Sequence, residues 1–289
     1  MRTIDLESLR IFRAVVDEGG VVRAAAKLNR VQSNVTTRVR QLEEHVGARL
    51  FRREGRNIRL STEGQKLLGY ADRLLRLADE AVSEMRTGKP RGIFRLGSLE
   101  STAGSRLPAL LSRYHAMFPE VVVELTTGTT GALIKRLTNF EIEAAFVSEP
   151  FCARHLEARP VFEEELVLVT SRMAGEMSRP ADLGSSTLIA FAHGCSYRKR
   201  VEEWLATADV VPDRVLEFAS YHAMIACVAA GTGFAVVPRS VLSDLRSAKG
   251  IHQHDLPKRF ALSRTHLVWS GEVSPALNGL ISLSLSARR

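Results

Sequence analysis

The chain has 289 residues, of which 45% are hydrophobic and 25% charged, and its formal net charge is +8 at pH 7. These values exclude a disordered or fibrous protein, and the length suits a small module followed by a larger two-lobed domain. Residues 1–60 contain thirteen Lys or Arg and seven Asp or Glu, so the positive charge is concentrated near the N-terminus.

The N-terminal 46 residues show three helical patterns. Apolar residues from Leu6 to Val16 recur at three- and four-residue steps, which predicts a first helix that ends at a glycine pair. A second helix is predicted over 22–28, where three consecutive alanines let another helix approach closely. A third helix is predicted from about residue 32 to residue 46. This succession is typical of a helix-turn-helix.

The outward face of the third helix is polar. Its side chains carry hydrogen-bond donors and acceptors that match base edges and phosphates in the major groove. The candidate DNA-binding residues on this helix are Gln32, Ser33, Asn34, Thr36, Thr37, Arg38 and Arg40.

A basic hairpin is predicted directly after this helix. Two short strand patterns, 49–51 and 58–60, are joined around Gly55, and five arginines fall within residues 49–59. A solvated charged loop is the alternative, but a hairpin places the arginines where they reach the phosphate backbone. The candidate contacts there are Arg52, Arg53 and Arg56.

A long helix is predicted from residue 62 to about residue 86. Its apolar residues are spaced 4, 3, 4, 3, 4, which is typical of a coiled-coil seam and favours a partner helix over packing on its own domain. Residues 1–61 are therefore expected to form a winged helix-turn-helix DNA-binding domain, and residues 62–90 a dimerising linker helix and hinge. The seam residues are Leu67, Ala71, Leu74, Ala78, Ala81 and Met85.

Beyond residue 90, strand-like and helical patterns alternate. Such alternation indicates an α/β fold with parallel strands, and its two successive sets predict two lobes with a cleft between them. Residues 91–289 are expected to form this domain, with lobe I at about 91–165 and 266–289 and lobe II at about 166–265.

The segment AAAKLNRVQSNVTTRVRQLEEHVGARLFRREGRNIRLSTEG, residues 24–64, resembles the LysR-type transcriptional regulators, and the likeness covers essentially the whole chain. It implies a winged helix-turn-helix, a dimerising linker helix, and an effector-binding domain with the type 2 periplasmic-binding-protein fold, assembled as a homodimer or homotetramer. Gln32 matches the polar residue that opens the family's recognition helix, and Thr36 stands at its usual serine. Val31, Ser33 and Thr37 depart from the residues of many members, so the resemblance gives no base preference.

Four downstream segments, 97–119, 127–137, 194–205 and 220–242, are similar to the family's ligand loops and the helices after them. Each loop precedes a helix, so free backbone N–H groups favour an anionic ligand group there; simple helix capping is the alternative. The candidate effector-binding residues are Ser98, Glu100, Ser101, Thr102, Thr127, Gly128, Thr129, Ser148, Cys195, Ser196, Tyr197 and His222.

Three of these residues carry further hypotheses. The Glu100 carboxylate predicts an effector that also bears a cationic group, unless it pairs with an arginine such as Arg198. Cys195 is a candidate redox thiol at a helix N-terminus, although a small lining residue is the favoured interpretation. His222 is either a pH-sensitive or ligand contact or a structural hydrogen-bond partner.

Several classes of protein find little support in the sequence. The chain contains no GxSxG, GxxxxGK or HExxH motif, so neither an enzyme nor a metal or cofactor site is expected. No apolar stretch approaches the roughly 20 residues that cross a bilayer. Acidic residues stand in the opening segment where a signal peptide needs its apolar region, which counts against a transport binding protein and predicts a cytoplasmic location.

The sequence thus predicts a DNA-binding transcriptional regulator whose activity responds to a small molecule bound between two lobes. The expected partners are double-stranded DNA, a small polar or anionic effector, and further copies of the chain in a homodimer or homotetramer. RNA polymerase is left open as an additional partner, and no membrane partner is expected.

Overall fold

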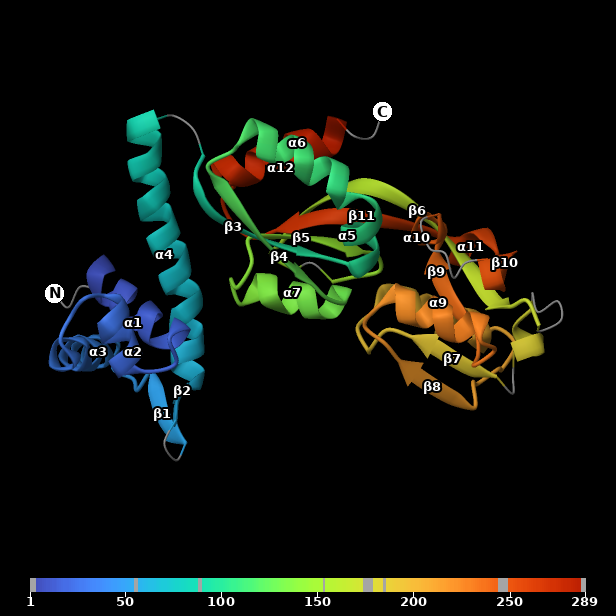
Figure 1. The fold of residues 1–289 in the computed structure, drawn as a ribbon, viewed down its shortest axis with the longest axis horizontal. Coiled ribbons are helices and arrows are strands. Elements are labelled where there is room, and N and C mark those ends of the chain that lie inside the picture. Colours follow the sequence, from blue (N-terminus) through green and yellow to red (C-terminus); the bar gives the residue numbers. More distant parts are fainter. Residues whose placement is uncertain are drawn as a thin grey trace. The chain divides into compact units, whose positions relative to one another are not determined.

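The computed structural model describes residues 4–54, 57–87, 90–152, 154–173, 179–183, 186–243 and 249–286 (Figure 1). The chain divides into two compact units, Met1–Pro90 with Asn139–Glu141, and Arg91–Thr138 with Ile142–Arg289. The first unit therefore contains the predicted DNA-binding and linker segments, and the second the predicted effector-binding segment. Among the described residues, no helix is both long and apolar enough to span a bilayer.

The first unit consists of four helices and a hairpin. Three helices, α1 (Leu6–Asp17), α2 (Val21–Lys27) and α3 (Gln32–Val46), precede the antiparallel strands β1 (Phe51–Glu54) and β2 (Asn57–Leu60), and α4 spans Thr62–Thr87. The Asp5 carboxylate caps α1 by accepting hydrogen bonds from the Ser8 amide at 2.7 Å and the Ser8 hydroxyl at 2.8 Å. This order of elements confirms the predicted winged helix-turn-helix.

Two buried clusters hold the first unit together. One joins α1, α2 and α3 around Ala24, whose small side chain lets the helices cross closely. The other joins Leu42 and Leu50 to Ala71 of α4. At the start of α4, a Cβ on Gly64 would lie 2.1 Å from the Leu50 carbonyl oxygen, so glycine is required for this close approach.

The exposed apolar face of α4 differs from the predicted seam. Leu67 and Ala71 pack into the second cluster of their own unit instead of facing outward. The predicted seam and the exposed row of apolar residues both contain Leu74 and Ala81, so spacing alone did not distinguish them. The predicted register was therefore wrong over the first turns, and the side chain of Met85 lies outside the described residues. The outward row includes Tyr70, Leu74, Leu77 and Ala81, again spaced 4, 3, 4.

The second unit begins with a mixed sheet that we call, together with its helices, lobe I. β3 (Gly92–Ser98) lies between the parallel strands β4 (Val121–Thr127) and β5 (Ala144–Ser148). β5 pairs antiparallel with β11 (Leu262–Trp269), which pairs antiparallel with the first half of β6 (Glu157–Ser171).

Helices cover both faces of this sheet. α6 (Leu107–Met117) and α12 (Pro275–Ser286) pack on one face, and α7 (Thr130–Thr138) lies on the other (Figure 1). The short α5 (Glu100–Ser105) follows β3 directly. Three parallel strands therefore end close to the first turns of α5 and α7, as is usual for ligand sites in sheets of this kind.

The second half of β6 belongs to a different set of strands, which we call lobe II. It pairs antiparallel with β9 (Ala235–Pro238) and β10 (Ile251–Asp255), whereas β7 (Thr187–Ala190) and β8 (Arg214–Glu217) form a parallel pair. The helices of lobe II are η1 (Pro180–Leu183), α8 (Ser196–Ala206), α9 (Tyr221–Ala229), α10 (Arg239–Leu242) and α11 (Lys258–Ala261).

The predicted α/β class is confirmed, but the expectation of parallel strands holds only in part. β6, β9, β10 and β11 pair antiparallel. β6 is also fifteen residues long, and only its second half has the apolar run that predicts a strand. Its first half contains a proline and three consecutive glutamates, and this polar composition concealed the strand.

Candidate functional site

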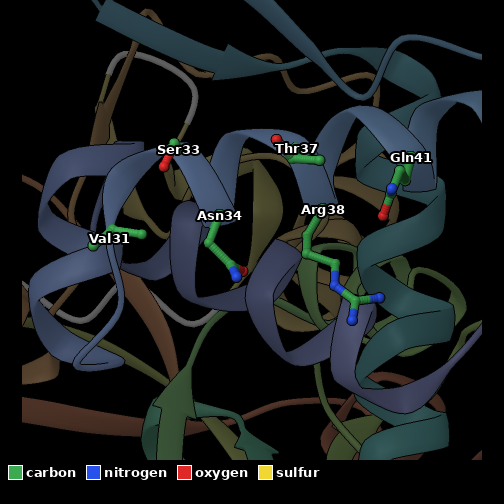
Figure 2. A pocket seen from close by; sticks show the side chains of 6 residues that line it. All are labelled: Val31, Ser33, Asn34, Thr37, Arg38 and Gln41. Atoms are coloured by element: carbon green, nitrogen blue, oxygen red, sulfur yellow. The ribbon is translucent and has the colours of Figure 1, made fainter.

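The outward surface of α3 forms a shallow groove of about 500 Å³ (Figure 2). α3 presents this surface because Val35, Val39 and Leu42 on its other side are buried in the core. The groove therefore offers hydroxyl, amide and guanidinium groups, which are the groups that contact base edges. Its lining residues are Val31, Ser33, Asn34, Thr37, Arg38 and Gln41.

Four of the predicted DNA-binding residues of α3 line this groove, and three do not. The Thr36 hydroxyl donates to the Gln32 carbonyl oxygen within the helix at 2.9 Å. Arg40 Nε donates to Glu44 Oε1 at 3.0 Å, one turn further along α3. Gln41 lines the groove but was missed, although its position four residues after Thr37 on the same helix face was a usable signal.

The hairpin brings two arginines together. Arg52 lies opposite Arg59 in the strand register, so their exposed side chains share one face, while Phe51 and Leu60 face the core. Like charges directly opposite each other repel, and a phosphate between them relieves that repulsion. Arg56 lies outside the described residues, as does the side chain of Arg53.

In the second unit, the predicted effector-binding residues gather where lobes I and II meet. Ser98 and Ser148 end the parallel strands β3 and β5, and Ser196 begins α8 of lobe II. Glu100, Gly128 and Thr129 are half-buried, whereas Thr127 and His222 are exposed. The fully buried members are Ser98, Ser101, Thr102, Ser148, Cys195, Ser196 and Tyr197.

Hydroxyl groups and one backbone amide join the two lobes directly. Ser196 Oγ of lobe II donates to the Ser148 carbonyl oxygen of lobe I at 2.7 Å and lies 2.9 Å from Thr130 Oγ1. The Gly131 amide of lobe I donates to the Gly194 carbonyl oxygen of lobe II at 3.1 Å. Gly194 has a φ of +90°, a conformation that favours glycine. Thr130 was missed from the sequence because either of the two adjacent threonines, Thr129 and Thr130, could have opened α7.

One buried cluster spans both lobes and continues from Leu133 of α7 to Trp204 of α8. This packing and the polar contacts hold the lobes against each other. A small cavity of about 10 Å³, which is the least that holds one water molecule, lies within lobe II. Among the residues that line this cavity are Phe191, Cys195, Tyr197, Arg198 and Tyr221.

Burial raises the pKa of the Cys195 thiol, although the Arg198 and Tyr197 amides in the first turn of α8 lower it. Desolvation outweighs these amides, so the thiol stays protonated near neutral pH and lacks the thiolate that a redox sensor needs. The geometry thus favours a lining role for Cys195.

The suggested partner of Glu100 was wrong. Arg198 Nε donates to Glu202 at 2.8 Å and Arg198 Nη1 donates to Glu217 at 2.6 Å, so its charge is committed within lobe II. Within the described parts of the chain, no group of three or more His, Cys, Asp or Glu side chains is placed to hold a metal ion.

Comparison with known families decides the class of this protein. Residues 6–65 match the model described as "Bacterial regulatory helix-turn-helix protein, lysR family", and residues 87–288 match the "LysR substrate binding domain". The chain belongs to the LysR family. This LysR-family protein is a DNA-binding transcriptional regulator with an effector-binding domain, and its named relatives are regulators rather than enzymes.

Similar proteins cover nearly the full length of this LysR-family chain. The HTH-type transcriptional regulator GltR of Bacillus subtilis (strain 168) is 33% identical over 282 residues, covering 96% of this chain and 95% of GltR. YofA of Bacillus velezensis is 35% identical over 282 residues, covering 95% of this chain and 97% of YofA.

Solved structures share the fold. CbnR, a LysR family transcriptional regulator, aligns with a TM-score of 0.69 at 23% identity over 99% of this chain and 100% of CbnR. ArgP from Mycobacterium tuberculosis aligns with a TM-score of 0.77 at 18% identity over 99% of this chain and 97% of ArgP.

Proposed function

We propose that this LysR-family regulator binds double-stranded DNA as a dimer, with α3 of each protomer in the major groove and the β1–β2 hairpin on the neighbouring backbone. The observation that carries the proposal is the open groove on α3, lined by Ser33, Asn34, Thr37 and Arg38. CbnR, which shares this fold, has been solved in complex with its target DNA. The exposed apolar row of α4 supports dimerisation.

The second part of the proposal is control by a small polar effector held between the lobes. Buried hydroxyls and the first turns of α7, α8 and α9 meet there, and all can bond a polar ligand. A ligand that takes over the Ser196 contacts binds best to separated lobes, so it shifts the equilibrium between lobe arrangements. That shift changes subunit packing and the spacing of the DNA-reading helices. No cofactor is needed for this mechanism.

Three accompanying statements stay predictions. They are the choice between homodimer and homotetramer, a contact with RNA polymerase, and a cytoplasmic location. The regulator function depends on none of them.

Gel shifts on DNA from upstream of the gene, over a salt series, test DNA binding. Replacing a bidentate base contact costs about 1–3 kcal/mol, so Arg38→Ala should weaken specific binding roughly tenfold to a hundredfold. Arg40→Ala is the matched control on the same helix, since Arg40 lies outside the groove and bonds to Glu44. Equal losses in the two variants, or no specific complex with folded dimeric protein, would contradict the proposal.

A further inference from the structure

We propose that the effector carries a protonated amine or guanidinium group and that the Glu100 carboxylate binds this group where α5, α8 and α9 meet. The proposal rests on the effector-responsive function above and narrows the chemical class of the effector.

Glu100 is the first residue of α5 and is half-buried. The first turn of α9 lies against it from lobe II, and both the Tyr221 amide and His222 act on its carboxylate. A carboxylate has about four acceptor positions, so Glu100 keeps capacity for a ligand. Glu100 thus stands at the boundary between the lobes, where a ligand enters when they separate.

Two arginines of the helices around α5 are committed to other carboxylates. Arg106 Nε donates to the buried Glu164 at 2.8 Å, and the other Glu164 oxygen accepts from Ser240 Oγ at 2.7 Å. Arg198 is bonded to Glu202 and Glu217. Within the described ranges, no lysine or arginine forms an ion pair with Glu100.

Desolvation therefore acts on a carboxylate that forms no ion pair with a lysine or arginine of the described ranges. Burial raises the pKa of Glu100, and the Tyr221 amide and His222 lower it only in part. A ligand cation placed against this carboxylate restores the stabilisation that burial removes. A ligand with carboxylate groups alone would instead be repelled by Glu100.

Three buried hydroxyl groups beside Glu100 supply the remaining contacts. In the described part of the chain, Ser101 Oγ, Thr102 Oγ1 and the Tyr197 hydroxyl make no hydrogen bond of normal geometry, and these residues are only 1–4% exposed. Burial raises the pKa of Tyr197 and of Tyr221, and the Ser101 hydroxyl lies close enough to both phenols to offset part of that rise, so α5, α8 and α9 approach one another there. Buried hydroxyls without partners are costly, so they favour a ligand that carries polar groups besides its cation.

Aromatic rings complete the setting. The Phe191 and Tyr221 rings lie 4.8 Å apart between centroids and line the small cavity within lobe II, at the first turn of α9. Aromatic faces attract ammonium and guanidinium groups. Carboxylate, hydroxyls and rings together fit an amino acid or a polar amine better than a plain carboxylic acid.

The test uses the full-length protein, thermal shift assays and isothermal titration. The amine-bearing probes are L-alanine, L-leucine, L-phenylalanine, L-lysine, L-arginine and putrescine, and the matched acids without the amine are propionate, isocaproate, hydrocinnamate and hexanoate. At least one amine-bearing probe should stabilise the protein, and its affinity should fall about tenfold or more in Glu100→Gln, because a charged hydrogen bond is lost. Glu120→Gln removes an exposed lobe I carboxylate and should leave the affinity unchanged.

Other outcomes overturn the proposal. These are stabilisation by an acid that is unaffected in Glu100→Gln, or no amine-specific stabilisation by any probe. Glu100→Asp keeps the charge and should retain the amine preference, which separates loss of charge from loss of fold. If an acid without an amine alters the gel shift, the regulator function stands and the amine proposal fails; if the protein forms no DNA complex at all, the proposed function itself fails.

Discussion

Glu43 is a buried carboxylate near the end of α3, and all of its hydrogen bonds lead towards the hairpin. Its Oε1 accepts from the Leu50 amide at 2.8 Å and from the Phe51 amide at 3.4 Å. Its Oε2 accepts from Arg49 Nη1 at 2.9 Å. One side chain therefore fixes the start of the hairpin relative to the α3 groove, although it lies outside that groove.

We expect Glu43→Ala to lower the free energy of unfolding of the first unit by about 1–3 kcal/mol, because the buried Leu50 amide loses its acceptor. Amide hydrogen exchange at Leu50 measures this directly and should become faster. Glu44→Ala alters an exposed carboxylate on the same turn and is the control. Equal exchange at Leu50 in the two variants would show that Glu43 has no such role.

At the scale of residues, helical periodicity predicted which face of α3 is exposed, but not which side chains of that face line the groove. Ser33, Asn34, Thr37 and Arg38 line the groove because they lie opposite the buried valines of α3. Thr36 is exposed but does not line the groove, and its hydroxyl bonds to the helix backbone; no sequence pattern reports such a side-chain rotamer.

At the scale of elements, α4 carries two apolar rows with different partners. The row that contains Leu67 and Ala71 is occupied by its own unit. The row that contains Leu74 and Leu77 is exposed, with Leu77 at 56% exposure. In the proposed dimer, this row packs against a second copy of the chain.

Leu77→Glu is expected to raise the dimer dissociation constant by roughly a hundredfold or more, because each lost leucine contributes about 1.5–3 kcal/mol and two copies are affected. Analytical ultracentrifugation measures the change. Gln65→Glu introduces the same charge at an exposed position away from this row and should leave the dimer intact. A dimer that tolerates Leu77→Glu would place the interface elsewhere.

The elements themselves were predicted unevenly, for a physical reason. α1 to α4 and the hairpin follow from local periodicity and were predicted close to their observed bounds. The antiparallel partners of β6 were not, because strand sense depends on which distant segment lies alongside, and β11 pairs with β5 and β6 across about a hundred residues or more. Local pattern carries no information about such pairings.

At the scale of the whole molecule, closure of the lobes depends on a few polar contacts as well as on packing. The Ser196 hydroxyl and the Gly131 amide form hydrogen bonds between the lobes, and one buried apolar cluster spans both lobes. Entry of an effector must therefore break these contacts first. The closed arrangement is the one that a ligand must compete with.

We expect Ser196→Ala to open the lobes more often, since a hydrogen bond contributes about 0.5–1.5 kcal/mol. The same free-energy change predicts that hydrogen exchange at the Gly131 amide, which donates across the boundary, becomes roughly twofold to tenfold faster. Ser282→Ala removes an exposed hydroxyl that bonds within α12 and serves as the control. Unchanged exchange at Gly131 would mean that packing alone holds the lobes together.

The path of the chain through the two lobes has a consequence for how such sensors diversify. The chain leaves lobe I within β6 and returns in β11, and Glu165 lies directly opposite Leu262 in the strand register. Residues 166–261 are thus an insertion whose two ends sit side by side. Recombination between related genes can exchange this insertion without changing the path of the chain through lobe I. One such event replaces half of a ligand-recognition surface and leaves the DNA-binding unit and its linker helix unaltered.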